Sequence, residues 1–207
     1  GDLLTVNQGT LYPVLLKQRS LLNIGIGLQR KSLTDTWAEG DIADRDVTAT
    51  TITVDGLAAA RRSRFRYQVA LTGGDLEING PADFITINAD TIDTAGQYRK
   101  LWAQAELFHP LRVGGAINFR LSGQLGNRNL DSSEKFLLGG YNGVRAYPEG
   151  EAAGDEALLA RLEWVMPLTF SAMPGKATIR TFVDGGTVWI VDDLRDGLAV
   201  ERRPRAG

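Results

Sequence analysis

The segment VGGAINFRLSGQ, residues 113–124, shows the clearest alternation of apolar and polar side chains in this sequence. Ile117, Phe119 and Leu121 occupy one set of alternate positions. Polar residues occupy the other set: Asn118, Arg120, Ser122 and Gln124. Successive side chains of a β-strand point to opposite faces, so this period of two predicts a strand with one apolar and one polar face.

The same alternation recurs along most of the chain, whereas helical periodicity is hard to find. Two further segments share the design, residues 22–29 and 64–72. Other strands are expected near residues 47–57, 98–109, 155–168 and 176–190, with a weaker one before Lys17. We therefore predict an all-β protein of about eight strands.

The expected connections alternate in length. Short turns are expected at residues 17–20, 59–63, 110–112 and 167–175. Long loops are expected at residues 34–44, 74–96 and 127–154, and another begins at Val191. Antiparallel neighbours place successive connections at opposite ends of a sheet, so all short turns lie at one end and all long loops at the other. This asymmetry is typical of an antiparallel up-and-down transmembrane β-barrel of the outer-membrane type.

A soluble β-sandwich is the alternative fold, because its strands also alternate apolar and polar residues. Many strands expected here are longer than the usual five or six residues, and they reach the roughly 9 to 11 residues that cross a bilayer at a tilt. Strand length therefore favours the membrane protein.

Composition excludes several classes of protein. The 207 residues carry a net charge of −2 with basic residues scattered among acidic ones, which argues against a nucleic-acid partner. Cysteine is absent, so disulfides, zinc–cysteine sites and thiol catalysis are excluded. No apolar run approaches the roughly 18 residues of a membrane helix. A mean hydropathy of −0.14 is compatible with membrane β-strands.

No constellation in the sequence predicts an enzyme, a metal site or a cofactor. His109 is the only histidine, it precedes Pro110, and no serine–aspartate partnership is suggested by spacing. Asp41, Asp44 and Asp46 lack the glycine and the distal glutamate of a calcium-binding EF-hand loop.

An ordered set of motifs follows in the segment from residue 138 to residue 164. It comprises Leu138-Gly139-Gly140, Gly143-Val144-Arg145-Ala146-Tyr147-Pro148, Gly150-Glu151-Ala152 and Gly154-Asp155-Glu156. A second motif is Phe182-Val183-Asp184-Gly185-Gly186, and weaker likenesses occur at Tyr12-Pro13 and in DTAGQYRKL, residues 93–101. In this order the motifs resemble two-partner secretion transporters, the TpsB family of haemolysin and filamentous adhesin secretion/activation proteins.

The resemblance implies a 16-stranded barrel in the bacterial outer membrane, preceded by two periplasmic POTRA domains. Residues 1–207 would form part of that one barrel domain, with the POTRA domains, the signal peptide and the opening and closing strands outside this chain. The implied partners are a secreted exoprotein of the TpsA type and outer-membrane lipid. The implied function is translocation of the unfolded exoprotein to the cell surface, with no small-molecule substrate and no bond broken or made.

Related assembly and insertase barrels of the same superfamily carry a similar Val-Arg-Gly-Phe/Tyr motif. This chain has Ala146 in the glycine position, and with the Pro-Glu-Gly-Glu-Ala and Gly-Asp-Glu segments that follow, this favours the secretion branch. An outer-membrane assembly or insertase barrel remains the alternative function. A porin-like passive channel and a soluble β-protein or hydrolase are further alternatives.

The resemblance also identifies candidate site residues. In the family the long loop folds back into the lumen, and its arginine meets the aspartate of the Phe-x-Asp-x-Gly strand, so Arg145 is expected to pair with Asp184. The loop motif comprises Gly143, Val144, Arg145, Ala146 and Tyr147, and the anchoring motif comprises Phe182, Asp184 and Gly186. Strand alternation places further polar residues toward the lumen: Arg120, Arg161, Glu163 and Arg180. An arginine suits this contact because its planar guanidinium can bond a carboxylate through two parallel N–H groups.

Overall fold

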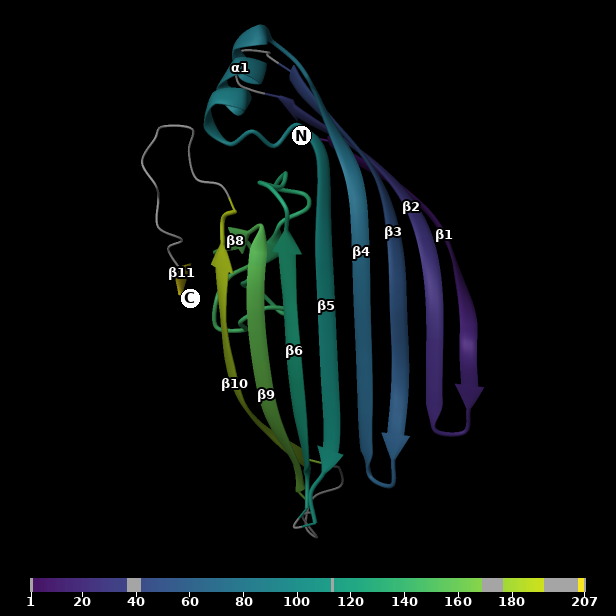
Figure 1. Cartoon of the computed structure of the whole chain (residues 1–207). Helices are drawn as coiled ribbons and strands as arrows, with labels where there is room; N and C mark the ends of the chain where they lie inside the picture. The colour runs from purple at the N-terminus through teal and green to yellow at the C-terminus, as the bar shows by residue number, and fades with distance from the viewer. Residues whose placement is uncertain (1, 37–41, 113, 169–176, 192–204, 207) are drawn as a thin grey trace.

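The computed structural model describes residues 2–36, 42–112, 114–168, 177–191 and 205–206. Eight long strands form one antiparallel sheet in which each strand pairs with the next long strand along the chain (Figure 1). They are β1 (Asp2–Lys17), β2 (Ser20–Thr36), β3 (Ile42–Ala60), β4 (Ser63–Asn79), β5 (Gly96–Pro110), β6 (Ala116–Gly126), β9 (Glu156–Leu168) and β10 (Ala177–Trp189). A short strand, β11 (Arg205–Ala206), pairs with β10. The prediction of an up-and-down all-β fold of about eight strands is confirmed.

The two faces of the sheet differ as the alternation predicts. Cross-strand pairing aligns Ile52 with Leu71, Leu71 with Leu101, and Leu101 with Leu125. These four side chains are all exposed, so this row is an apolar outer surface that suits contact with lipid. Among the described residues, no helix is long and apolar enough to cross a membrane.

Opposite this apolar row, the inner face carries polar side chains that bond to one another across the strands. The Thr51 and Thr72 hydroxyls lie 2.9 Å apart on β3 and β4, and the Asn23 amide donates to Asp55 at 2.9 Å between β2 and β3. Cross-strand pairs of this kind stabilise a sheet and satisfy polar groups that face the interior.

The short turns expected at residues 17–20 and 59–63 are present, and each has two residues between the last paired positions, Lys17 and Ser20 in one and Ala60 and Ser63 in the other. The turn after Pro110 extends to Gly115, because β6 begins at Ala116. The fourth expected turn falls largely at residues 169–176, outside the described residues.

Two of the expected long loops are wrong in extent. The pairing of β2 with β3 continues to Thr36 and Ile42, so most of the expected loop at 34–44 is strand, and residues 37–41 lie outside the described part. Likewise β4 continues to Asn79, so the connection to β5 begins six residues later than position 74 predicts. Near the end of β4 the pattern reverses, with Asp75 and Glu77 facing outward and Leu76 and Ile78 packed inward against the buried cluster that contains Leu130. The outward-apolar alternation therefore no longer marks the strand there.

The connection between β4 and β5 contains a helix that the sequence analysis missed, α1 (Ala82–Thr91). It follows Pro81, whose φ of −56° suits a helix start, and it ends where the Ile92 and Asp93 amides both donate to the Asn88 carbonyl. β-branched residues such as Ile85 and Thr86 favour strands over helices, which explains the omission.

The third long connection, residues 127–154, lies against the inner face of the sheet. Its own two-stranded ladder pairs β7 (Phe136–Leu137) with β8 (Ala153–Gly154). This segment is contacted by side chains from β2, β3, β5, β6, β9 and β10. The sheet must therefore curve around it, which places the candidate site on the concave side.

Candidate functional site

The tip of the 127–154 segment is held in a compact ring of backbone hydrogen bonds. The Val144 amide donates to the Leu138 carbonyl at 2.6 Å, and the Gly140 amide donates to the Tyr147 carbonyl at 2.9 Å. Gly140 has a φ of +90°, a backbone conformation that is unfavourable for residues with a side chain. A Cβ on Gly143 would overlap the Leu138 carbonyl oxygen. These bonds turn the chain back on itself and present Arg145 to β9 and β10.

Arg145 binds Asp184 through both side chain and backbone. Its Nε donates to Asp184 Oδ2 at 2.7 Å and its Nη2 to Oδ1 at 2.8 Å, which is the bidentate geometry of guanidinium and carboxylate. The Arg145 amide also donates to Oδ2, at 3.2 Å. The Asp184 side chain is only 2% exposed and that of Arg145 is 19% exposed. The contact therefore holds the loop tip firmly against β10.

Neighbouring charges extend this contact into a cluster. Arg145 Nη1 donates to Glu163 Oε2 at 2.5 Å, and Arg180 donates to the other oxygen of Glu163 at 3.0 Å. Arg161 Nε lies 3.6 Å from Asp184 Oδ1. We name the Arg145 cluster as Arg145, Asp184, Glu163, Arg161, Arg180 and Phe182.

Phe182 is the uncharged member of the Arg145 cluster. The Arg145 guanidinium carbon lies 3.7 Å from the centre of the Phe182 ring, within the range of a cation–π interaction. Because Phe182 and Asp184 are two positions apart on β10, both side chains project to the same face and contact one guanidinium. The spacing of the Phe-x-Asp motif thus places an aromatic ring and a carboxylate side by side against Arg145.

The structure places the remaining candidate residues in different ways. Gly143 and Val144 are buried, while Ala146 and Tyr147 are exposed. Arg120 lies outside the Arg145 cluster and pairs with Glu106 at 3.6 Å on the neighbouring strand. It nevertheless lines the same polar cavity of about 430 Å³, together with Asn118, Tyr141, Asn142, Arg145, Arg161, Glu163 and Arg180.

An apolar contact holds the loop tip beside the charged one. Leu138 and Val144 of the loop pack against Leu159 and Val188 of β9 and β10, and all four are at least 96% buried. Gly186 lies beneath them, because a Cβ there would come within 2.6 Å of Leu138 Cδ1 and 2.8 Å of the Leu158 carbonyl oxygen. The glycine of the anchoring motif therefore leaves room for the loop.

The sequence analysis missed a second anchor, at residues 129–135, which we name the loop root. Glu134 is bound by Lys31 of β2 at 2.5 Å and by Lys100 of β5 at 2.6 Å. Gln124 of β6 donates to the Glu134 carbonyl at 3.1 Å. This single loop residue therefore contacts three strands.

Two further carboxylates hold the loop root. Arg45 of β3 binds Asp131 at 2.5 Å, and the Ser133 amide donates to Asp131 at 2.9 Å. Asp155 is fully buried and accepts the amides of Leu130 and Val191 at 2.9 and 3.1 Å. Leu130 itself is buried in a second apolar cluster, with Val47, Leu76 and Tyr98.

Electrostatics favours the charged forms of the two loop-root acids. Burial alone would raise the pKa of the Asp131 carboxyl, but bonds from the Ser133 amide and the charge of Arg45 outweigh it, and the pKa lies below its ordinary value. Burial also opposes ionisation of Glu134, and Lys100 and Lys31 together lower its pKa. The alternation that puts Lys31 and Lys100 on the inner face was a signal for this site, but no local pattern pairs them with Glu134.

Of the other residues considered for chemistry, the described ones lie on separate strands, His109 on β5 and Asp44 and Asp46 on β3. The His109 ring Nδ1 lies 2.8 Å from Ser63 Oγ at the turn end of the sheet. Asp44 and Asp46 belong to β3, and Asp41 lies outside the described residues. Within the described part of the chain, no group of three or more histidine or acidic side chains is placed to hold a metal ion.

Comparison with known proteins identifies the family of this chain. Residues 9–199 match the family "Haemolysin secretion/activation protein ShlB/FhaC/HecB". Among curated proteins, the chain is 43% identical over 49 residues to "Heme/hemopexin transporter protein HuxB" from Haemophilus influenzae strains Rd and 86-028NP. That match covers 24% of this chain and 9% of the relative, so the likeness to HuxB concerns a small part of each protein.

Proposed function

Because the chain belongs to the haemolysin secretion/activation protein family, whose members are outer-membrane transporters, we propose that it forms part of a pore through which an unfolded partner exoprotein reaches the cell surface. The exoprotein would be of the haemolysin or adhesin type. In the full-length transporter we expect POTRA domains on the periplasmic side and further strands that close the barrel around the inner face.

The observation that carries this proposal is the loop tip bound to the inner wall by the Arg145 cluster. A segment that lies along the inner face occupies space that a translocating polypeptide would use. Its contacts are ionic and border a polar cavity, so water can compete for them more readily than for a dry apolar contact. This supports a role for residues 127–154 as an element that must be correctly positioned for transport.

The proposed mechanism contains no chemical step. The bidentate contact of Arg145 with Asp184 orients the tip, Leu138 and Val144 exclude water from one side of it, and the loop root fixes its base. An exoprotein that folds outside the cell would supply the driving force, because folding withdraws the emerging chain from the pore.

Secretion by the full-length transporter tests the proposal. We expect Arg145→Ala to lower the amount of exoprotein released while the barrel still assembles, since the wall strands pair without that side chain. Arg30→Ala is the matched control, because Arg30 is an exposed arginine of β2 on the outer face. Wild-type secretion by Arg145→Ala in a correctly assembled barrel would contradict the proposed role.

The insertase alternative predicts a different defect. If the protein assembled other outer-membrane proteins, its depletion would lower the levels of unrelated barrels in the membrane. If it is a dedicated secretion pore, those levels stay constant and only its partner exoprotein accumulates in the periplasm. One depletion experiment, followed by quantification of both classes of protein, separates the two functions.

A further inference from the structure

The short turns of the sheet carry an unbalanced positive charge. Lys17 and Arg19 lie at the β1–β2 turn, Arg61 and Arg62 form the β3–β4 turn, and Arg112 lies in the β5–β6 turn. No aspartate or glutamate occurs in residues 17–20, 60–63 or 110–116. We name these five residues the basic turn surface.

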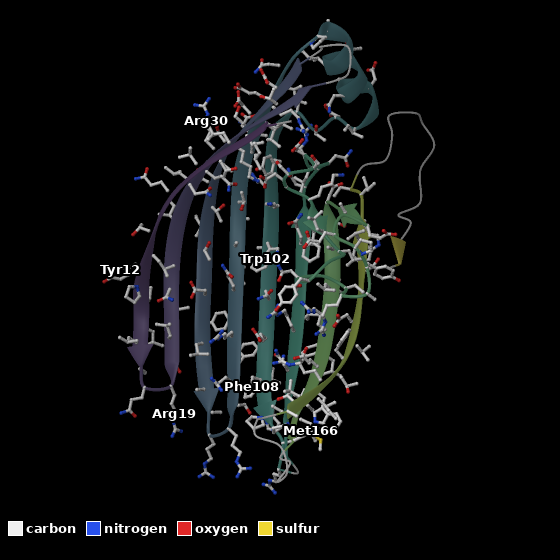
Figure 2. All side chains as sticks on the ribbon, turned by 180° about the vertical axis from the view of Figure 1, so that it is seen from behind. Tyr12, Arg19, Arg30, Trp102, Phe108 and Met166 are labelled. Atoms are coloured by element: carbon white, nitrogen blue, oxygen red, sulfur yellow. The ribbon has the colours of Figure 1, made fainter. Side chains whose placement is uncertain are left out.

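All five side chains are exposed, and within the described part of the structure none makes an ion pair with a carboxylate. Figure 2 shows the Arg19 side chain extending beyond the turn end of the sheet, while Arg30 lies toward the opposite end. Exposed charges of one sign attract counter-charges from outside the molecule. The basic turn surface is therefore available to an external anionic partner.

The apolar outer surface sets the height of these charges relative to a membrane. On β4 the outward residues from Phe65 to Leu71 are apolar or aromatic, and the nearest turn cation is Arg62. Three residues at about 3.3 Å each place Arg62 about 10 Å below Phe65 along the strand, and strand tilt shortens that distance along the membrane normal. The headgroup layer is roughly 5 to 8 Å thick on each side of the hydrocarbon core. The turn cations therefore lie at headgroup depth.

Among the described residues, the opposite end of the sheet has no such excess of positive charge. Its strands carry carboxylates among their cations, including Asp44, Asp46, Asp75 and Glu77. Trp164, on the outer face of β9 and 40% exposed, pairs with Ile117 near the turn end, which is a usual position for an interfacial tryptophan. This difference in charge between the two ends of the sheet means that each end would meet its membrane leaflet with a different charge.

We propose that the basic turn surface binds the phosphates of anionic phospholipids in the periplasmic leaflet and so fixes the depth and orientation of the barrel. This rests on the outer-membrane location and on the short turns facing the periplasm. Lipid is favoured over an acidic polypeptide because the cations spread over three successive turns along the rim of the apolar surface. By contrast, arginines inside the curved sheet, such as Arg145 of the loop tip and Arg180 of β10, already have carboxylate partners.

Quenching of Trp164 fluorescence by brominated phospholipids tests the proposal in the full-length transporter. The protein is reconstituted in phosphatidylcholine vesicles that contain brominated phosphatidylglycerol or brominated phosphatidylcholine, and the Trp164 contribution is the part lost in Trp164→Phe. We expect the wild type to prefer the anionic lipid roughly fivefold at low salt, the effect of one well-placed cation near a charged surface. The preference should fall as salt is added.

A charge-matched pair of variants locates the effect. Arg62→Gln/Arg112→Gln should lose most of the preference, whereas Arg30→Gln/Arg99→Gln, which removes two exposed arginines nearer the other end, should keep it. Equal preference in the wild type and the turn variant overturns the proposal. A wild type that shows no lipid preference, yet binds a deca-glutamate peptide that the turn variant does not bind, would instead assign the surface to an acidic protein partner.

Because the assay contains no exoprotein, its result does not depend on the proposed secretion function. A transporter that failed to secrete could still show the lipid preference, and a secreting transporter could lack it. The two proposals can therefore fail separately.

Discussion

Arg145 and Asp184 lie 39 residues apart in the sequence, yet the carboxylate of Asp184 accepts hydrogen bonds from both the guanidinium and the backbone amide of Arg145. The side-chain hydrogen bonds hold the guanidinium of Arg145 in place, and the hydrogen bond from its backbone N–H holds the backbone of the loop tip. Glu163 adds a second carboxylate to the same guanidinium. The position of the tip relative to β10 is thus determined by several contacts that should act together.

Coupling between Arg145 and Asp184 can be measured with a double-mutant cycle on secretion by the full-length transporter. Breaking a buried ion pair from one side costs about 3 to 5 kcal/mol, and the polar cavity beside it should reduce that cost. Arg145→Ala and Asp184→Ala should each lower secretion strongly, and the double variant should lose much less than the two losses combined. Strictly additive losses on a logarithmic scale would show that the residues act independently.

Gly186 and its neighbour Gly185 offer a test of the space beneath the loop. A Cβ at Gly186 would meet Leu138 and the Leu158 carbonyl, whereas a Cβ at Gly185 has nothing within 4 Å. Gly186→Ala should therefore displace the loop tip and lower secretion, and Gly185→Ala should behave as the wild type. Protease sensitivity of the 127–154 segment reports the displacement, and similar sensitivity in both variants would refute the packing argument.

The loop root should depend on pH through Asp131 and Glu134. Both carboxyls have a pKa below the ordinary values of about 3.9 and 4.3, so their contribution to stability is fully present above those values. It is lost as pH falls through the lower folded-state pKa. The chain contains no cysteine, so a spin label at Leu137→Cys, an exposed position, can report loop mobility in the full-length protein.

We expect that label to be immobile from neutral pH down to about pH 4.3 and to gain mobility progressively below it. In the Asp131→Asn/Glu134→Gln background the label should already be mobile at neutral pH, because Lys31, Lys100 and Arg45 lose their charged partners. Unchanged mobility of the wild type at a pH low enough to protonate both carboxyls would mean that these acids do not hold the loop root.

Adjacent residues of β4 test the assignment of the two faces. Val69 is 39% exposed on the apolar outer surface, and Gln68 is an exposed residue of the inner face opposite Asp55. Val69→Arg should impair barrel assembly, because an arginine facing lipid near the midplane costs about 2 to 4 kcal/mol. Gln68→Arg should be tolerated. The heat-modifiable mobility of the full-length barrel on gels measures assembly, and equal assembly of both variants would show that the faces are misassigned.

Local sequence determined which side chains face outward and which face inward. Phe119 and Arg120 illustrate this, since the position of each depends only on the period of two within one strand. The same rule held most clearly in β4 and β6, whereas β1 has Gln8 and Thr10 on its outer face and Leu11 on its inner face. Local sequence could not set the ends of the strands, and the expected loop at 34–44 was wrong in extent because Thr34 and Asp44 still pair beyond the apolar part of the outer face.

The pairing of Arg145 with Asp184 was expected only from a resemblance between motifs, and no spacing rule leads from one residue to the other. The contact of Glu134 with Lys31 was not expected at all, although these residues lie 103 positions apart on one curved surface. Alternation places Lys31 on the inner face, but the alternation does not specify which carboxylate of the loop will bind it. The curvature of the whole sheet decides that, because it brings β2, β5 and β6 close enough for a single loop residue to bind all three.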